Sequence, residues 1–182
     1  MVDSPVISSE RLHLVPLTTE FMQASLRADW EQAGRLLGAP LTADWSDAQD
    51  LLALRIKQLE ADPTLQRWLL RAMVRRADRV VVGRIGFHEA PGPEHYREIA
   101  PGAAEFGFEV FGPYRRQGYA IEAARALMQW AHEEHRVPRF VLTISPQNLP
   151  SQALAAKLGF VRIGSHMDDV DGEEDILILE CP

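Results

Sequence analysis

The stretch Val110-Phe111-Gly112-Pro113-Tyr114-Arg115-Arg116-Gln117-Gly118-Tyr119-Ala120 joins a predicted strand to a predicted helix. Residues 104–109 before it are aromatic and mostly alternating, which favours a strand. Residues 120–134 after it carry apolar side chains at spacings of three and four, which predict a helix. A glycine at a helix start lets the backbone approach a ligand, and the first-turn N–H groups attract anions. Because Arg115 and Arg116 add positive charge, the stretch predicts a site for a phosphorylated ligand.

Two common phosphate motifs, G-x-x-x-x-G-K-[ST] and G-x-G-x-x-G, are absent from the chain. Residues 115–120 instead read Arg-x-x-Gly-x-Ala, and Val110 stands five residues before the arginine. This pattern resembles the pyrophosphate loop of the GNAT superfamily of N-acetyltransferases, [Q/R]-x-x-G-x-[G/A], which binds acetyl-coenzyme A. Taken by itself, the pattern also fits a capped helix with solvated arginines.

A second GNAT signature supports the resemblance. Residues 148–160 are similar to N-x-x-S followed by a short helix that ends in Leu-Gly-Phe, and a predicted strand over residues 138–145 precedes them. We expect Ser151 to cap this helix and Gly159 to end it in the left-handed conformation. For Asn148 and Ser151, the alternative to a functional role is turn and cap chemistry alone.

Residues 8–17 are similar to the first strand of the RimJ/RimL-type branch, whose members acetylate protein N-termini and small amines. The resemblance covers roughly residues 8–180. It implies an α/β (α+β) GNAT fold: a mixed, mostly antiparallel twisted sheet of about seven strands, with helices on both faces and a splay at the central strands. We expect a single GNAT-type domain over residues 1–182, and the branch leaves a homodimer open.

Composition narrows the class of partner. A chain of 182 residues fits one domain with a full core. The net charge of −7 argues against nucleic-acid binding and suits a cationic partner such as an amine. No apolar run is long enough for a membrane span, and residues 1–5 lack the pattern of a secretory signal. Because Cys181 is the one cysteine, we expect a reducing, cytoplasmic location.

The rest of the sequence predicts further strands and helices, and it contains two groups of possible metal ligands that lack the spacing of a metal site. Strands are expected at residues 7–17, 67–76, 79–88, 160–166 and 176–180, and helices at 20–29 (capped by Thr18 or Thr19), at 31–37, and from Ser46 or Asp47 onward. Trp45 is expected to pack rather than to bind a ligand. The acidic residues 167–174 lack the spacing of a calcium loop and favour a hairpin turn. His132 and His135 form H-x-x-H rather than a zinc-protease motif, so no metal is expected.

The resemblance implies roles for the residues around the first signature. Acetyl would pass from acetyl-coenzyme A to a primary amine in a ternary complex. Backbone groups of Glu109 and Val110 would bind the pantetheine arm, and the N–H of Val110 would stabilise the oxyanion. The pyrophosphate would bind residues Arg115, Arg116, Gln117, Gly118, Tyr119 and Ala120. Asn148 and Ser151 would hold the cofactor's arm or fix the loop.

Glu105 stands ten residues before Arg115, where family members carry a catalytic glutamate. Burial in an aromatic strand is expected to raise its pKa, which suits a general base. Alternatively, Glu105 faces solvent or pairs with an arginine such as Arg84, and Glu109 is the second candidate for the base. His88 and His95 are expected to be surface or packing residues.

The general acid departs from the family pattern, because Ala155 occupies the position of the usual tyrosine. Ser151 is the replacement proton donor, although the thiolate is also a good enough leaving group to need none. The missing tyrosine keeps a second function open: a coenzyme A-binding regulatory or scaffold protein whose catalysis has decayed.

Overall fold

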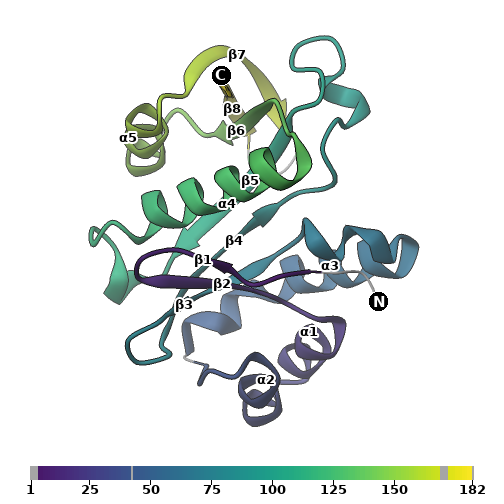
Figure 1. Cartoon of the computed structure of the whole chain (residues 1–182), viewed down its shortest axis with the longest axis vertical. Coiled ribbons are helices and arrows are strands. Elements are labelled where there is room, and N and C mark those ends of the chain that lie inside the picture. The colour runs from purple at the N-terminus through teal and green to yellow at the C-terminus, as the bar shows by residue number, and fades with distance from the viewer. Residues whose placement is uncertain (1–3, 42, 169–171, 182) are drawn as a thin grey trace. The chain divides into compact units, whose positions relative to one another are not determined.

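A computed structural model of the chain describes residues 4–41, 43–168 and 172–181 (Figure 1). The chain divides into two compact units. Unit 1 comprises residues 1–86 and 108–127, and unit 2 comprises residues 87–107 and 128–182. Strands β4 (Val81–Phe87) and β5 (Ala104–Val110) and helix α4 (Tyr119–His135) each continue from one unit into the other along the chain.

The sheet is mixed and mostly antiparallel, as the sequence predicts. Its eight strands within the described residues follow the order β1-β2-β3-β4-β5-β6-β8-β7. The pairs β1–β2, β2–β3, β3–β4, β6–β8 and β7–β8 are antiparallel, and β5–β6 is parallel. The pairing of β5 with β6 covers Ala104 and Glu105, two of the seven residues of β5. This short pairing is the expected splay at the central strands.

Unit 1 begins with a hairpin where one strand over residues 7–17 was predicted. Strands β1 (Ile7–Ser8) and β2 (Leu12–Pro16) are antiparallel, and Ser9 closes the turn between them. The N–H of Ser9 donates to the carbonyl of Leu12 at 2.9 Å, and the N–H of Leu12 donates to the Ser9 hydroxyl at 3.2 Å. The serine side chain therefore breaks the strand into two, which explains the eighth strand.

The helices of unit 1 follow local cap signals where such signals exist. Those before β3 are α1 (Thr19–Leu26), α2 (Trp30–Leu37), the 3₁₀ helix η1 (Ala43–Ala48), α3 (Gln49–Ala61) and the 3₁₀ helix η2 (Pro63–Arg67), and the short 3₁₀ helix η4 (Gly112–Tyr114) follows β5. The Thr18 hydroxyl accepts from the N–H of Phe21 at 3.2 Å, which confirms the predicted cap of α1. Gly38 ends α2 with a φ of 69°. The predicted start of the long helix at Ser46 or Asp47 is too early, because both residues lie within η1 and α3 begins at Gln49.

Strand β3 (Arg71–Arg75) is shorter than the predicted 67–76, because η2 and the turn after it take up residues 63–70. A hydrophobic cluster joins β3 and β4 to the helices of unit 1 and includes Phe21, Trp45, Leu52, Ala72, Val74, Val81 and Phe111. The Trp45 side chain is 1% exposed and makes edge contacts with the rings of Phe21 and Phe111. This packing confirms the prediction for Trp45.

Unit 2 holds the second half of the sheet and the second signature. Strand β6 (Arg139–Ile144) pairs with β8 (Gly172–Glu180), and β8 pairs with β7 (Val161–Asp168). The register runs to the pair Asp168–Gly172, so both strands extend into the acidic turn predicted over residues 167–174, and residues 169–171 of that turn lie outside the described residues. Helix α5 (Leu149–Leu158) ends at Gly159 with a φ of 93°, as predicted. Within the described part of the chain, no helix is long and apolar enough to cross a bilayer.

Candidate active site

The phosphate loop, defined here as residues 111–118, lies in unit 1 between β5 and α4. The Arg115 Nε–H donates to the carbonyl of Val110 at 2.8 Å, so this arginine folds back onto the loop. The Gln117 side-chain amide donates to the carbonyl of Pro113 at 3.1 Å. Arg116 and Gly118 are left-handed, with φ angles of 61° and 84°. These two residues turn the chain into the helix, so the loop has the conformation its glycine predicts.

The start of α4 offers the N–H groups that an anion needs. The helix begins at Tyr119, and the N–H of Glu122 donates to the carbonyl of Gly118 at 3.1 Å. The N–H groups of the residues before Glu122 in the first turn have no intrahelical acceptor, because an α-helix supplies none there. A helix start of this kind, with its dipole, suits an anion such as a phosphate.

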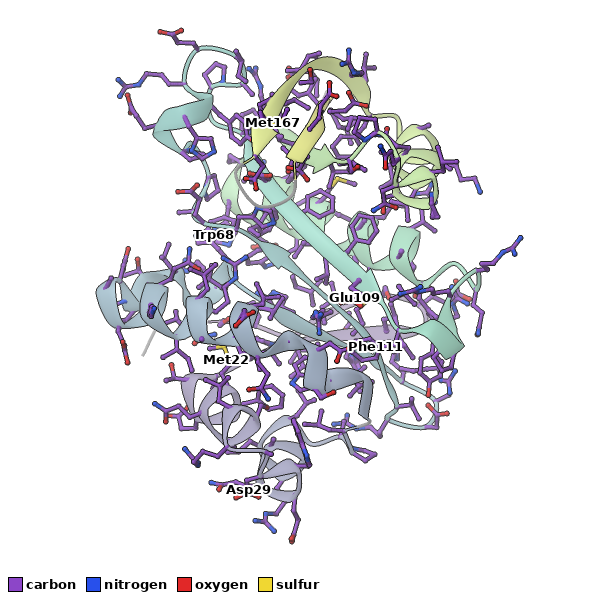
Figure 2. All side chains as sticks on the ribbon, turned by 180° about the vertical axis from the view of Figure 1, so that it is seen from behind. Met22, Asp29, Trp68, Glu109, Phe111 and Met167 are labelled. Carbon is purple, nitrogen blue, oxygen red and sulfur yellow. The ribbon has the colours of Figure 1, made fainter. Side chains whose placement is uncertain are left out.

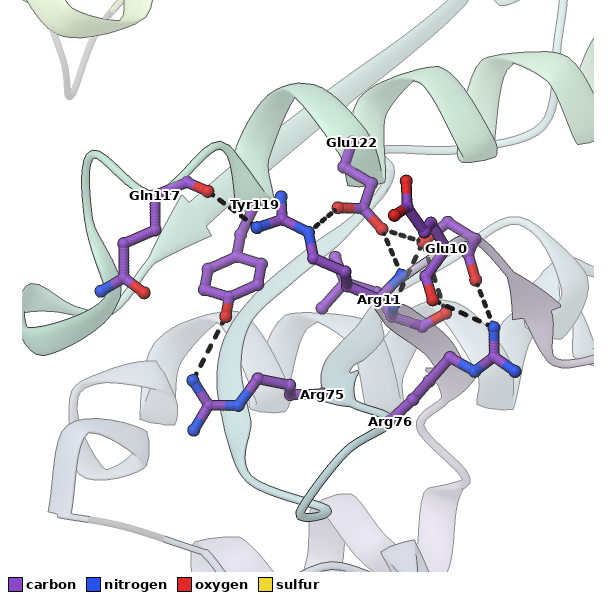
Figure 3. Close-up of polar contacts among 9 residues, drawn as sticks. Glu10, Arg11, Arg75, Arg76, Gln117, Tyr119 and Glu122 are labelled. Carbon is purple, nitrogen blue, oxygen red and sulfur yellow. Dashed lines mark hydrogen bonds and ion pairs between the residues drawn. The ribbon is translucent and has the colours of Figure 1, made fainter.

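Arg11 holds the phosphate loop from the β1–β2 hairpin (Figure 3). Its Nε–H donates to Glu122 Oε2 at 2.7 Å and its Nη1–H to the carbonyl of Gln117 at 3.0 Å. Its guanidinium carbon lies 4.6 Å from the centre of the Tyr119 ring. Sequence analysis missed Arg11, because no local signal links it to residues more than a hundred positions later.

The two residues that Arg11 contacts on α4, Tyr119 and Glu122, each have a further hydrogen-bond partner. The Tyr119 hydroxyl accepts from Arg75 Nη1 at 3.2 Å, and the Glu122 carboxylate accepts from the Ser9 hydroxyl at 2.7 Å. Burial raises the pKa of Glu122, but hydrogen bonds from Ser9 and Arg11 and the charge of Arg11 outweigh it and lower the pKa. Glu122 is therefore ionised at neutral pH and anchors the arginine.

Glu109 and Phe111 lie at the end of β5 (Figure 2). The Glu109 carboxylate forms an ion pair with Arg84, a buried residue of β4. The suggested pairing of Arg84 with Glu105 is therefore wrong, since Arg84 faces Glu109. A Cβ placed on Gly83 would lie 2.1 Å from the carbonyl oxygen of Glu109, so only glycine fits there.

Glu105 lies in unit 2, where its carboxylate is surrounded by three partner side chains, those of His88, Tyr96 and Thr143. Its side chain is 10% exposed. Its Oε1 accepts from the Thr143 hydroxyl at 2.7 Å and lies 3.4 Å from His88 Nδ1. The hydroxyl of Tyr96, at the end of the 3₁₀ helix η3 (Glu94–Tyr96), also donates to it.

These partners overturn the expected pKa of Glu105. Burial raises it, but the hydrogen bond and charge of His88 and the hydrogen bonds from Thr143 and Tyr96 outweigh burial and lower the pKa to about 2. Three donors stabilise the carboxylate form, so the prediction of a raised pKa is wrong. The location of Glu105 in a buried, polar cluster on β5 nevertheless fits a site that handles protons.

Asn148, and not the predicted Ser151, caps helix α5. The Asn148 side chain accepts from the N–H of Ser151 at 3.3 Å, and Asn148 is the N-cap of α5. Ser151 lies inside the first turn, so the expectation that it caps the helix is wrong. Ser151 is partly exposed, and its hydroxyl is not the cap of the helix. Ala155 is fully buried in α5.

The described residues contain no cluster of three or more His, Cys, Asp and Glu side chains placed to bind a metal ion. The H-x-x-H pair has structural contacts instead. His132 Nδ1 lies 3.0 Å from the carbonyl oxygen of Val137, and the His135 ring packs 4.7 Å from Trp130.

Residues 11–161 match the acetyltransferase (GNAT) domain family. The chain belongs to the GNAT family. The GNAT chain is 32% identical over 93 residues to the uncharacterized N-acetyltransferase YnaD of Bacillus subtilis, which is 50% of this chain and 49% of that protein. It thus spans about half the length of this curated relative. It is also 25% identical over 170 residues to the FsC-acetyl coenzyme A-N(2)-transacetylase of Aspergillus fumigatus, which is 92% of this chain and 69% of that protein.

Solved structures share the fold. RimJ of Mycobacterium smegmatis in complex with CoA-disulfide superposes with a TM-score of 0.61 over 93% of this chain and 81% of that chain. The two sequences are 20% identical. The likeness shows that this GNAT chain has the fold of that protein.

Proposed function

We propose that this GNAT chain transfers the acetyl group of acetyl-coenzyme A to a primary amine by direct attack in a ternary complex. The observation that carries the proposal is the phosphate loop: a left-handed Gly118 opens α4, and Arg11 holds the loop from outside. Family membership and the coenzyme A named with the RimJ structure support the choice of ligand.

In this proposal the pyrophosphate is bound by the end of the phosphate loop and the start of α4, that is by Arg115, Arg116, Gln117, Gly118, Tyr119 and Ala120. Glu109 and Val110 bind the pantetheine arm through their backbone, and the N–H of Val110 donates to the oxyanion. Because a backbone N–H in a strand is already fixed, it needs no reorganisation as charge develops on the carbonyl oxygen. Asn148 and Ser151 complete the cofactor contacts at the start of α5.

Catalysis requires that a protonated amine loses a proton before it attacks the thioester. Glu105 contributes an ionised carboxylate to that proton path, supported by its burial and its three donors. Ser151 donates a proton to the leaving thiolate, because its hydroxyl lies in the first turn of α5 and leaves the capping role to Asn148. Amine and thioester held in this order react as one bound pair.

The acceptor in this proposal is the amine of a peptide N-terminus or of a small molecule. The fold shared with RimJ supports the RimJ/RimL-type branch. We infer that residues 1–182 form one catalytic domain that works in the cytoplasm, alone or as a homodimer. The single cysteine supports this location, and the net charge of −7 suits an amine acceptor. Neither nucleic acid nor membrane is part of it.

One observation favours a second function. The fully buried Ala155 stands where the family carries the tyrosine that serves as its acid. A coenzyme A-binding regulatory or scaffold protein would keep the phosphate loop and lose turnover.

Calorimetric titration with acetyl-coenzyme A, followed by a thiol-release assay over amines and N-terminal peptides, tests the two functions. Binding with thiol release on one acceptor class supports the transferase and names the acceptor. Binding without release on any acceptor favours the regulatory function. The absence of binding overturns both, because both rest on the phosphate loop.

A further inference from the structure

Glu109 lies near the end of β5, one residue before Val110 (Figure 2). Its side chain is 39% exposed, and its carboxylate forms an ion pair with the guanidinium of Arg84. Among the residues that the structure describes, Arg84 is the one side-chain partner of this carboxylate. A carboxylate that is partly exposed and has a single partner can take a second cation from a ligand.

Arg84 lies on β4 and is held in the interior of unit 1. Its side chain is 10% exposed, and its guanidinium carbon lies 6.0 Å from the centre of the Trp45 ring and 5.9 Å from that of Phe111. Both rings are buried. Within the described part of the chain, Glu109 is the one carboxylate paired with this arginine, and Arg84 Nη1 is buried without an acceptor. The two rings and the carboxylate therefore fix the guanidinium.

The stability of the fold is a weak explanation for this ion pair. Burial removes water from the guanidinium of Arg84, and one carboxylate that is itself partly exposed replaces only part of that hydration. Buried ion pairs therefore add little to stability, and apolar side chains of similar size often serve as well. A charged pair next to the proposed oxyanion donor points instead to a role in the site.

The backbone places Glu109 beside the N–H group that the proposed function assigns to the oxyanion. The N–H of Phe111 donates to the carbonyl of Val82 on β4 at 3.0 Å. Because N–H groups alternate in direction along a strand, the N–H of Val110 points away from β4. An amine that attacks a carbonyl bound there must come within about 3–3.5 Å of the carbonyl carbon. The Glu109 side chain, one residue away, is therefore within reach of that amine.

We propose that Glu109 binds the ammonium group of the acceptor before acetyl transfer, and that Arg84 is the residue that positions its carboxylate. The inference rests on the proposed transferase function and deepens it, since it states which form of the acceptor is recognised: an amine that carries its positive charge. The ion pair sets the amine nitrogen beside the acetyl carbonyl and so orients the attack. Amines that are neutral at the working pH, such as anilines, lack the charge that this carboxylate binds.

The partner of Glu109 favours a role in binding over a role in proton transfer. A proton on Glu109 would leave the buried charge of Arg84 without its counter-charge, and an unpaired buried charge is strongly unfavourable. Removal of the proton from the docked ammonium is therefore a separate step, which the proposed function assigns to the path of Glu105.

Steady-state kinetics on the full chain test the role of Glu109 with two acceptors. One is a short peptide whose N-terminus is its one amine, and the other is a simple alkylamine. Glu109→Gln keeps the size of the side chain but removes its charge. At pH 7, where both amines are protonated, the variant should raise KM for each about tenfold, because a charge-assisted hydrogen bond is lost. Both kcat and the affinity for acetyl-coenzyme A should stay within about twofold of the wild type.

The dependence of this effect on pH separates binding of the ammonium from a structural role. The amine of a peptide N-terminus has a pKa of about 8, and that of an alkylamine is close to the value of lysine, about 10.4. Between pH 7 and pH 9 the ratio of the variant KM to the wild-type KM should fall from about tenfold to about twofold for the peptide, because most of the peptide becomes neutral. For the alkylamine, the ratio should stay about tenfold.

Glu180→Gln is the matched control, since Glu180 on β8 also pairs across strands with a partly buried arginine, Arg139 of β6, at 3.1 Å. It should keep the wild-type KM and kcat. Arg84→Lys tests the positioning role, because it keeps the charge but loses the flat guanidinium that lies between the two rings. KM for both amines should rise about threefold or more with kcat unchanged, since a lysine cannot hold the carboxylate in the same way.

The outcomes separate this inference from the function on which it rests. If the wild type acetylates either amine and Glu109→Gln leaves KM unchanged at pH 7, the assignment of Glu109 is overturned and the transferase function stands. A fall in kcat with an unchanged KM also overturns it, because that result belongs to a base. A raised KM for the peptide that is the same at both pH values shows a structural role and overturns it as well. A wild type that binds acetyl-coenzyme A and releases no thiol with any acceptor overturns the transferase function first.

Discussion

The side-chain oxygen of Asn148 accepts a hydrogen bond from the backbone N–H of Ser151 at 3.3 Å, which makes Asn148 the N-cap of α5. The Ser151 hydroxyl is therefore not needed as the cap. Asn148→Ala should lower the free energy of unfolding by about 1 kcal/mol, because one N–H of the first turn loses its acceptor. Ser151→Ala should leave stability unchanged and lower kcat. Urea unfolding and steady-state kinetics on both variants separate the two roles, and equal stability losses would contradict them.

The contact of Arg11 with the phosphate loop predicts an effect on cofactor affinity from the far end of the sequence. Arg11→Ala removes the donor to the Gln117 carbonyl and to Glu122, so the loop should lose its fixed shape. We expect the Kd for acetyl-coenzyme A to rise about tenfold, a cost of about 1.4 kcal/mol. Arg76→Ala is the control, since Arg76 binds the carbonyls of Ser9 and Glu10 in the same hairpin without reaching the loop.

Gly118 combines a left-handed backbone with a confined position. Gly118→Glu should abolish binding of acetyl-coenzyme A, because it places a negative charge beside the phosphate site and a side chain 3.3 Å from Arg11. Gly118→Ala should weaken binding only in part, through a backbone cost of roughly 1–2 kcal/mol. Gly112→Ala, in the same loop with nothing within 4 Å, should bind like the wild type in calorimetry. Unchanged affinity in Gly118→Glu would move the phosphate site elsewhere.

The lowered pKa of Glu105 predicts how stability depends on acid. Its pKa is about 2 in the folded chain against an ordinary value near 4.5, so the unfolded chain binds the proton more readily. The contribution is fully present above pH 4.5 and is lost as the pH falls toward 2. It amounts to about 3 kcal/mol, from roughly 1.4 kcal/mol for each tenfold change in proton affinity.

Glu105→Gln should flatten the fall in stability over that window, measured by urea unfolding at several pH values. Glu31→Gln is the control, because Glu31 is an exposed carboxylate paired with Arg35 on α2. It should leave the acid dependence as it is in the wild type. An unchanged slope in Glu105→Gln would show that the three donors do not hold the carboxylate in solution.

Local signals in the sequence were sufficient to predict backbone conformation and helix caps that depend on one residue and its neighbours in the chain. Gly38, Gly118 and Gly159 are left-handed because a turn or helix end needs that conformation. Thr18 caps α1 because its hydroxyl reaches an N–H three residues later. The two GNAT signatures are local as well, so the family could be identified before the fold.

Properties that depend on partners from other elements could not be predicted in this way. The pKa of Glu105 depends on Thr143 from β6, Tyr96 from η3 and His88 after β4, so burial alone gave the wrong sign. The cap at Asn148 rather than Ser151 depends on which residue begins the helix, and element boundaries are the weakest part of sequence-based prediction.

The bond between Arg11 and Glu122 joins residues 111 positions apart. The backbone hydrogen bonds of helix α4 join residues that are close in sequence. The shape of the phosphate loop, in contrast, also depends on the contact that Arg11 of the N-terminal hairpin makes with the Gln117 carbonyl. Contacts of such long range are made late when a chain folds, because the intervening loop must close first. On refolding from denaturant, the helical signal should therefore return before the chain regains its affinity for acetyl-coenzyme A.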